Sequence, residues 1–460
     1  MTEPSGLRRS LGFTDLLLIT MGTVIGSGIY LVPSIVLRQT GEQTTLALVV
    51  WAVAGLLSLL GALTYAELGG MRPEAGGLYA YIRDAFGPLP AFLYGWASFV
   101  VIASGSIAAL AVAFSNYLGP LLPGVSLPAP VVPVLVIAIV AVVNVRGTRN
   151  SATVQNWTTG AKVGALALLS LVLIIRAGGA ASPAAAATPA VAPNVSLAAG
   201  LGAAMIGVLW AYEGWQYVTF SAGEARDPQR TFPRAISIAT LLLVVLYLLA
   251  NVGYIAALGP DGAARSERVA ADAVATAFGP IAGSIVATLI LVSIFSALNG
   301  LVLTTPRMYY AMARDGMFFE RLAAVHPRFG TPAFAIVTLT AWAALLAASG
   351  TFEQLLTYAV FTGWIFYALG ALAVFVFRRR EPNAARPFRV PGYPVTPMLF
   401  VGAAAALVIN TVITQSLRAA IGLGVVALGA PAFYVWRARR AARQRAGLPA
   451  STLENSSRIP

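Results

Sequence analysis

Two apolar stretches of the chain carry glycines and polar side chains where a helix would otherwise continue. Residues 22–30 read Gly-Thr-Val-Ile-Gly-Ser-Gly-Ile-Tyr, and residues 207–215 read Gly-Val-Leu-Trp-Ala-Tyr-Glu-Gly-Trp. Each glycine costs a helix about 1 kcal/mol relative to alanine, so both stretches are candidates for a break in the helix. In membrane proteins, helices that are interrupted at corresponding positions in the two halves of the chain indicate the binding site of a transporter.

The alternative is that these glycines only let neighbouring helices approach closely. Two features favour a binding site over simple packing. Ser27 places a hydroxyl between two glycines, and Glu213 places a carboxylate beside Gly214. An ionisable group at this depth in a membrane helix is functional by default.

Lys162 is a third candidate for chemistry, because it is the only lysine of the chain and lies inside an apolar run. An unpaired charge near the middle of a bilayer costs roughly 2.5 to 3.5 kcal/mol even on the lenient insertion scale. Snorkelling to the interface is the alternative. The apolar run continues far beyond Lys162 before it reaches Arg176, so we expect Lys162 to have partners within the protein.

The sequence lacks the residues that metal binding or enzymatic catalysis usually requires. The chain has no cysteine, and its single histidine, His326, falls in a predicted cytoplasmic loop. We therefore expect no metal site, no cofactor and no enzymatic activity. A channel or a membrane-embedded sensor could also use broken helices. However, the sequence contains neither a carbonyl filter motif nor a soluble signalling domain.

The elements that must position these residues are membrane helices. The composition is 58% hydrophobic and 10% charged, whereas soluble domains carry about 25% charged residues. Lipid tolerates only helices or closed barrels, and the apolar runs are too long for barrel strands. Twelve spans are predicted, at residues 16–36, 45–65, 89–117, 130–145, 157–175, 197–220, 236–258, 271–303, 332–348, 355–377, 395–413 and 419–436.

The net charge of +13 reports topology and does not indicate a nucleic-acid partner. Most of the 30 Lys and Arg residues fall in the segments that are cytoplasmic if the N-terminus is inside. Because cytoplasmic loops carry an excess of basic residues, both termini are predicted to be cytoplasmic. We expect a multi-pass protein of the cell (inner) membrane, surrounded by the lipid bilayer.

The predicted organisation has no soluble domain of useful size. The order is a cytoplasmic N-terminus, a first five-helix repeat, an external loop, a second five-helix repeat, two further helices and a cytoplasmic basic tail. These segments are residues 1–14, 15–177, 178–196, 197–380, 381–436 and 437–460.

Short motifs along the chain resemble those of amino acid permeases of the APC superfamily. Residues 26–30 look like the helix 1 signature of that family, and residues 210–215 resemble its helix 6, especially in the L-type amino acid transporter branch. Further similar motifs are residues 65–69, 75–81, 227–236, 299–300, 313–316 and 386–391. They occur in the expected order between about residue 11 and residue 436.

The resemblance implies an all-α membrane protein with twelve transmembrane helices. It further implies a LeuT-type 5+5 inverted repeat with helices 1 and 6 broken, followed by two C-terminal helices. The substrate would be held by its α-amino and α-carboxylate groups. The residues implied in substrate binding are Val24, Ile25, Gly26, Ser27, Gly28, Ile29, Trp210, Ala211, Glu213, Ser296 and Asn299.

Within that set, the amides of Ser27, Gly28 and Ile29 would hold the carboxylate, because amides at the start of a half-helix favour an anion. Carbonyl oxygens would accept from the amino group, namely those of Val24, Trp210, Ala211 and Glu213. Trp210 occupies the position of the family's aromatic lid. Residues implied in gating or coupling are Lys162, Trp210, Tyr247 and Ser293.

Three roles for Glu213 stay open. It could hold the break together through backbone N–H groups, which we favour, protonate during transport, or select a cationic side chain. Lys162 resembles a lysine that stands where sodium-coupled relatives bind sodium. It is expected to bridge carbonyls near Gly22 to Ile25 and the hydroxyl of Ser293 or Ser296.

The expected function is sodium-independent exchange or facilitated transport of small or medium neutral L-amino acids by alternating access. The alternative is proton-coupled or exchange transport of cationic amino acids or amines. An oligomer is possible. An ancillary subunit linked by a disulfide is not expected, because the chain has no cysteine.

Overall fold

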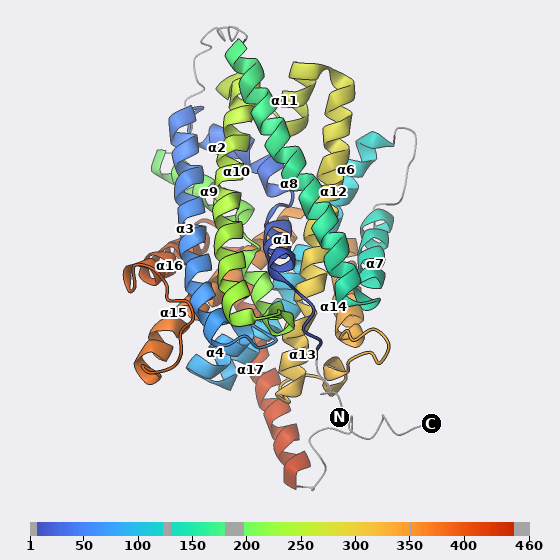
Figure 1. The fold of residues 1–460 in the computed structure, drawn as a ribbon, viewed down its shortest axis with the longest axis vertical. Coiled ribbons are helices and arrows are strands. Elements are labelled where there is room, and N and C mark those ends of the chain that lie inside the picture. Colours follow the sequence, from blue (N-terminus) through green and yellow to red (C-terminus); the bar gives the residue numbers. More distant parts are fainter. Residues whose placement is uncertain (1–6, 123–127, 129, 180–196, 350–351, 446–460) are drawn as a thin grey trace.

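A computed structural model describes residues 7–122, 128, 130–179, 197–349 and 352–445 of the protein (Figure 1). These residues form an all-helical structure without a named strand, and a single isolated bridge joins Leu11 to Ala225. The predicted external loop at 178–196 lies outside the described residues except for its first two positions. The predicted terminal segments 1–14 and 437–460 are described only in part.

In the first half of the chain, the described residues form eight α-helices and two short helices of other types. Their bounds are α1 Phe13–Val24, α2 Gly28–Gln39, α3 Thr44–Met71, α4 Leu78–Phe86, α5 Pro88–Ala97, η1 Ser98–Ile102, α6 Ala103–Leu118, η2 Gly119–Leu121, α7 Val131–Val145 and α8 Thr148–Gly179. The second half contains α9 Leu197–Ala211, η3 Trp215–Glu224, α10 Pro228–Arg265, α11 Val269–Phe278, α12 Pro280–Thr304, α13 Pro306–Arg314, η4 Glu320–Ala323, α14 Ala333–Ser349, α15 Phe352–Arg380, α16 Val395–Thr414 and α17 Ser416–Arg445.

Within the described residues, eight helices are long and apolar enough to cross a membrane. The number rises to nine if the bent pair α1 and α2 forms one span. Three further predicted spans correspond to the shorter apolar helices α7, α9 and α14. The protein is an all-α membrane protein, whereas the count of twelve spans stays a prediction.

The long run at residues 271–303 was expected as one helix, and that expectation is wrong. The structure divides it into α11 and α12 at Gly279, whose φ of 89° lies outside the range of helical residues. Pro280 follows and lacks the N–H that a continuous helix would need. The run at 89–117 is continuous but contains one π-helical turn, η1, between α5 and α6.

Helix α1 lies inside the bundle, where it packs against α8, α10 and α12 (Figure 1). Helix α10 also packs against α3 and α8, so three long helices, α8, α10 and α12, contact the short one. A fully buried ion pair ties α13 to η3, because Arg307 Nε donates to Glu224 Oε2 at 2.7 Å. Arg307 also donates to Thr148 Oγ1 at the start of α8, at 2.7 Å.

Candidate substrate site at two helix breaks

The first break separates α1 from α2, which are bent by 44° relative to one another. Helix α1 ends at Val24, and α2 begins at Gly28. The first amides of a helix have no partner within it. Among the described residues, no acceptor is found for the amide nitrogens of Ser27, Gly28 or Ile29. The break therefore presents three free donors at the positive end of a helix dipole.

The second break follows α9, which ends at Ala211. The amide of Glu213 turns back to the carbonyl oxygen of Trp210 at 2.9 Å. Gly214 then takes a φ of 133°, which favours glycine, and the chain continues as the 3-10 helix η3. The glycine at this point therefore changes the direction of the backbone, in addition to allowing close packing of neighbouring helices.

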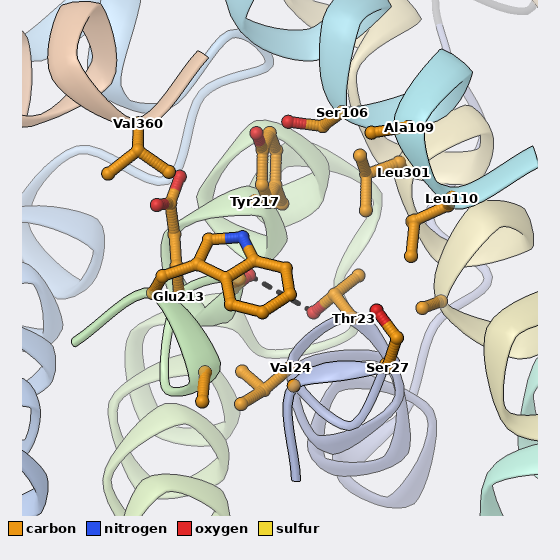
Figure 2. A pocket seen from close by; sticks show the side chains of 16 residues that line it. Thr23, Val24, Ser27, Ser106, Ala109, Leu110, Glu213, Tyr217, Leu301 and Val360 are labelled. Carbon is orange, nitrogen blue, oxygen red and sulfur yellow. Dashed lines mark hydrogen bonds between the residues drawn. The ribbon is translucent and has the colours of Figure 1, made fainter. Parts of the chain in front are cut away.

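The two breaks contact each other directly. Thr23 Oγ1 donates to the carbonyl oxygen of Gly214 at 3.0 Å, the contact drawn as a dashed line in Figure 2. A Cβ on Gly214 would lie 2.6 Å from the carbonyl oxygen of Thr23. A Cβ on Gly28 would lie 2.9 Å from Cα of Ala211. Glycine at these two positions permits an approach that any side chain would prevent.

A cavity of about 60 Å³ lies between the breaks. Seven of the predicted substrate residues line it: Val24, Gly26, Ser27, Gly28, Trp210, Ala211 and Glu213. Figure 2 shows Ser27 and Val24 at one end of this cavity, with Ser106 and Tyr217 at the other.

Among the residues that the structure describes, three buried polar atoms of the cavity lining have no hydrogen-bond partner: Ser27 Oγ, Glu213 Oε2 and Tyr217 OH. Buried polar atoms in proteins are nearly always paired, so each unpaired one needs an explanation. Because all three belong to residues that line one cavity, a polar ligand in that cavity could pair them.

The carboxylate of Glu213 contacts side chains and not the backbone of the break. Its Oε1 accepts from Tyr367 OH at 2.9 Å and from Gln216 Nε2 at 3.4 Å. Among the described residues, no backbone N–H group donates to this carboxylate, so the role that we favoured for Glu213, holding backbone N–H groups, is not seen in this arrangement. The Gly214 amide donates to Gln216 Oε1 instead, at 3.0 Å.

Lys162 projects from α8 to the first break and is 1% exposed. Its Nζ donates to the carbonyl oxygens of Gly22 at 2.8 Å and Ile25 at 2.5 Å. The third acceptor is the backbone carbonyl oxygen of Ser293 at 3.3 Å, where the sequence suggested a hydroxyl. The Ser293 hydroxyl itself donates to the Ile25 carbonyl oxygen at 3.1 Å.

The remaining predicted residues lie around the cavity but do not line it. Tyr247 is fully buried, and its OH donates to the Val24 carbonyl oxygen at 3.2 Å. Ile25 and Ile29 are fully buried beside the break. Ser296 and Asn299 of α12 contact α8 instead, where Gln155 bonds to both.

Sequence reasoning missed several residues that line the cavity, among them Thr23, Ser106, Tyr217 and Val360. Thr23 lies inside the glycine-rich stretch, so its position in the motif could have identified it. Ser106 follows the π-helical turn η1, a feature frequent at functional sites. No local signal in the sequence identifies Val360, which comes from α15.

Comparison with known proteins decides the family. Residues 11–429 match the amino acid permease family. The chain belongs to this family. The resemblance drawn from the motifs is confirmed, and the function class of an integral membrane transporter follows for this permease.

Several curated relatives of the permease are amino acid transporters. It is 31% identical to the serine/threonine exchanger SteT of Bacillus subtilis (strain 168), over 96% of this chain and 99% of SteT. It is 33% identical to the human b(0,+)-type amino acid transporter 1, over 90% of this chain and 84% of that one. It is 31% identical to the human cystine/glutamate transporter, over 94% and 87%.

Proposed function

We propose that this permease is a sodium-independent exchanger or facilitator of small or medium neutral L-amino acids. It works by alternating access in the cell (inner) membrane, with twelve spans, a LeuT-type 5+5 inverted repeat and both termini cytoplasmic. It is a transporter and not an enzyme. The observation that carries the proposal is the set of three free amides, at Ser27, Gly28 and Ile29, beside a cavity with unpaired polar atoms.

The chemistry of these groups fits an α-amino acid. The free amides and the Ser27 hydroxyl can donate to an α-carboxylate, and the dipole of α2 favours the negative charge. Carbonyl oxygens at the ends of α1 and α9 can accept from the α-ammonium group. Zwitterion recognition by two broken helices therefore requires no metal and no cofactor.

The cavity supports a small substrate. Its volume of about 60 Å³ leaves little space for a large side chain in this conformation. Ser106 and Tyr217, at the end opposite Ser27, can form hydrogen bonds with a short polar side chain. SteT exchanges serine and threonine, as its name states, and we propose substrates of this size for this permease.

A second candidate function is exchange or proton-coupled transport of cationic amino acids or amines. Glu213 Oε2 favours it, because this buried carboxylate oxygen belongs to the cavity lining and has no hydrogen-bond partner among the residues described. A substrate ammonium or guanidinium group would supply the missing donor.

The test is exchange in liposomes that contain purified protein and are preloaded with one of the twenty amino acids at a time. We expect saturable uptake of labelled serine or alanine that is accelerated by internal neutral L-amino acids, with D-serine as the stereochemical control. Acceleration by arginine or lysine alone would establish the second candidate. Absence of acceleration by any amino acid, with protein that is folded and inserted, would reject the substrate class.

The liposome exchange assay requires no ancillary subunit. The sequence has no cysteine, so a disulfide to an ancillary subunit cannot form. Purified single-chain protein is therefore the appropriate preparation.

A further inference from the structure

Six polar side chains form a buried cluster outside the candidate substrate site. They come from α7, α8 and α12, and each is at most 1% exposed. We refer to Asn144, Ser151, Gln155, Thr159, Ser296 and Asn299 as the polar cluster. Ser296 and Asn299 were the two residues of α12 that the sequence analysis assigned to the substrate.

The amide side chains of the polar cluster pair with one another. Asn299 Nδ2 donates to Gln155 Oε1 at 2.9 Å, and Asn144 Nδ2 donates to Asn299 Oδ1 at 2.9 Å. Gln155 Nε2 reaches the hydroxyls of Thr159 at 3.3 Å and Ser296 at 3.4 Å. A fully paired buried network specifies one arrangement of the helices that supply it. Gln155 joins α8 to α12 together with Ser151, which donates to Asn299 Oδ1 at 3.3 Å, and Thr159, whose hydroxyl lies 3.2 Å from that of Ser296. Gln155 is the only one of these three whose side chain bonds to both Ser296 and Asn299 among the described residues.

Helix α1 forms none of these hydrogen bonds, and it contacts Gln155 by close packing. A Cβ on Gly22 would lie 2.0 Å from Gln155 Nε2 and 2.3 Å from Thr159 Oγ1. A Cβ on Gly300 of α12 would lie 3.2 Å from the same Nε2 atom. The Gln155 amide therefore occupies a notch that two glycines leave between α1 and α12.

Lys162 follows Gln155 on the same face of α8, two helical turns further along. Its Nζ donates to the carbonyl oxygen of Gly22, the residue whose missing side chain accommodates Gln155. Gly22 is thus contacted by both residues, by Gln155 at its Cα and by Lys162 at its carbonyl oxygen. A shift of α8 along α1 would alter both contacts together.

We propose that Gln155 is a positioning residue for Lys162. The polar cluster anchors α8 to α12, and the glycine notch sets the position of α8 along α1. Together they place the Lys162 ammonium group at the carbonyls of the first helix break. This inference rests on the proposed function, because the exchange rate is its principal readout.

The experiment is a double-mutant cycle with Gln155→Ala and Lys162→Ala, measured as exchange of labelled serine in liposomes. Gln155→Ala should lower the maximal exchange rate about tenfold and change KM by less than about twofold. In the Lys162→Ala background, it should lower the rate by less than about twofold, because the positioned group is gone. Equal factors in both backgrounds would overturn the proposal.

Two further variants separate positioning from packing. Gln155→Met keeps the side-chain length but cannot accept from Asn299, and it should be as slow as Gln155→Ala. Full activity of Gln155→Met would also overturn the proposal. Ser170→Ala is the matched control, because this buried hydroxyl of α8 bonds to Leu166 of its own helix and to no other residue that the structure describes. Its exchange rate should equal that of the wild type.

The same cycle can be measured without transport, from the melting temperatures of purified proteins in detergent. If Gln155 and Lys162 act on one contact, the melting temperature of the double variant should fall by less than the sum of the decreases in the two single variants. Additive losses contradict the proposal. If the wild type exchanges no amino acid, the proposed function fails, while the melting cycle still decides the role of Gln155.

Discussion

Glu213 is the residue that distinguishes the two proposed substrate classes. Its carboxylate is held on one oxygen by Tyr367 and Gln216, while the other oxygen has no hydrogen-bond partner in the described part of the chain. Such an arrangement fixes the carboxylate and leaves one acceptor for a ligand. A neutral substrate can donate from an ammonium group to nearby carbonyls, whereas a cationic side chain would require Glu213 itself.

The variant Glu213→Gln tests this difference, because it keeps the shape and removes the charge. We expect the exchange rate of neutral substrates to stay within about threefold of the wild-type rate. Basic amino acids should become at least about tenfold weaker competitors. The measurement is inhibition of labelled serine exchange by unlabelled alanine, arginine and lysine. A variant with the competition profile of the wild type would remove Glu213 from substrate selection.

At the scale of elements, the site depends on two breaks that fit against each other. The contact between Thr23 and Gly214 joins the end of α1 to the turn after α9. The missing side chains of Gly28 and Gly214 allow this approach. The start of α2 and the turn after α9 therefore approach this closely only because both glycines are present.

Replacement of Gly214 by alanine should disrupt this contact. Its φ of 133° strains any L side chain, and the new Cβ would lie 2.6 Å from the Thr23 carbonyl oxygen. We expect Gly214→Ala to lose at least about tenfold in exchange rate and to lower the melting temperature by several degrees. Exchange and differential scanning fluorimetry measure the two effects.

Gly160→Ala in α8 is the matched control. A Cβ there would meet no atom within 4 Å, and alanine favours a helix by about 1 kcal/mol over glycine. The control should exchange normally and melt no lower than the wild type. If Gly214→Ala behaves like this control, the close approach of the breaks is not required for transport.

At the scale of the whole molecule, Lys162 connects the outer layer of helices to the break at the centre. Its Nζ donates to carbonyl oxygens of α1 and α12 and to that of Ile25 within the break, so it occupies these oxygens. A bound sodium ion would have to compete with Lys162 Nζ for the same carbonyl oxygens. Transport by this protein should therefore not require sodium.

This prediction is checked by exchange in choline buffer and in sodium buffer. Wild-type rates should agree within about twofold, and Lys162→Ala should slow exchange at least about tenfold. The Lys162→Ala protein should still be purified as a folded protein, because its binding partners are backbone groups. Strict sodium dependence of the wild type, with normal exchange by Lys162→Ala, would contradict the assignment.

Much of this protein was predictable from its sequence because the decisive signals are local. Apolar length and low charge identify a membrane protein, and the glycines at 22–28 and 214 mark places where helical hydrogen bonds are easily lost. The motifs at 26–30 and 210–215 indicate the family, which the comparisons confirm. From the residues alone, Lys162 was expected to have partners within the protein. The resemblance to the family implied that these partners lie near Gly22 to Ile25, where the structure has them.

Tertiary structure alone decided which face of each helix meets the cavity. Ser296 and Asn299 turn to Gln155, while Ala297 and Leu301 of the same helix line the cavity. In a membrane helix nearly every face is apolar, so the periodicity that locates the core of a soluble protein is weak. The partners of Glu213 likewise come from a distant helix, and only the packing of α15 against the second break brings Tyr367 to it.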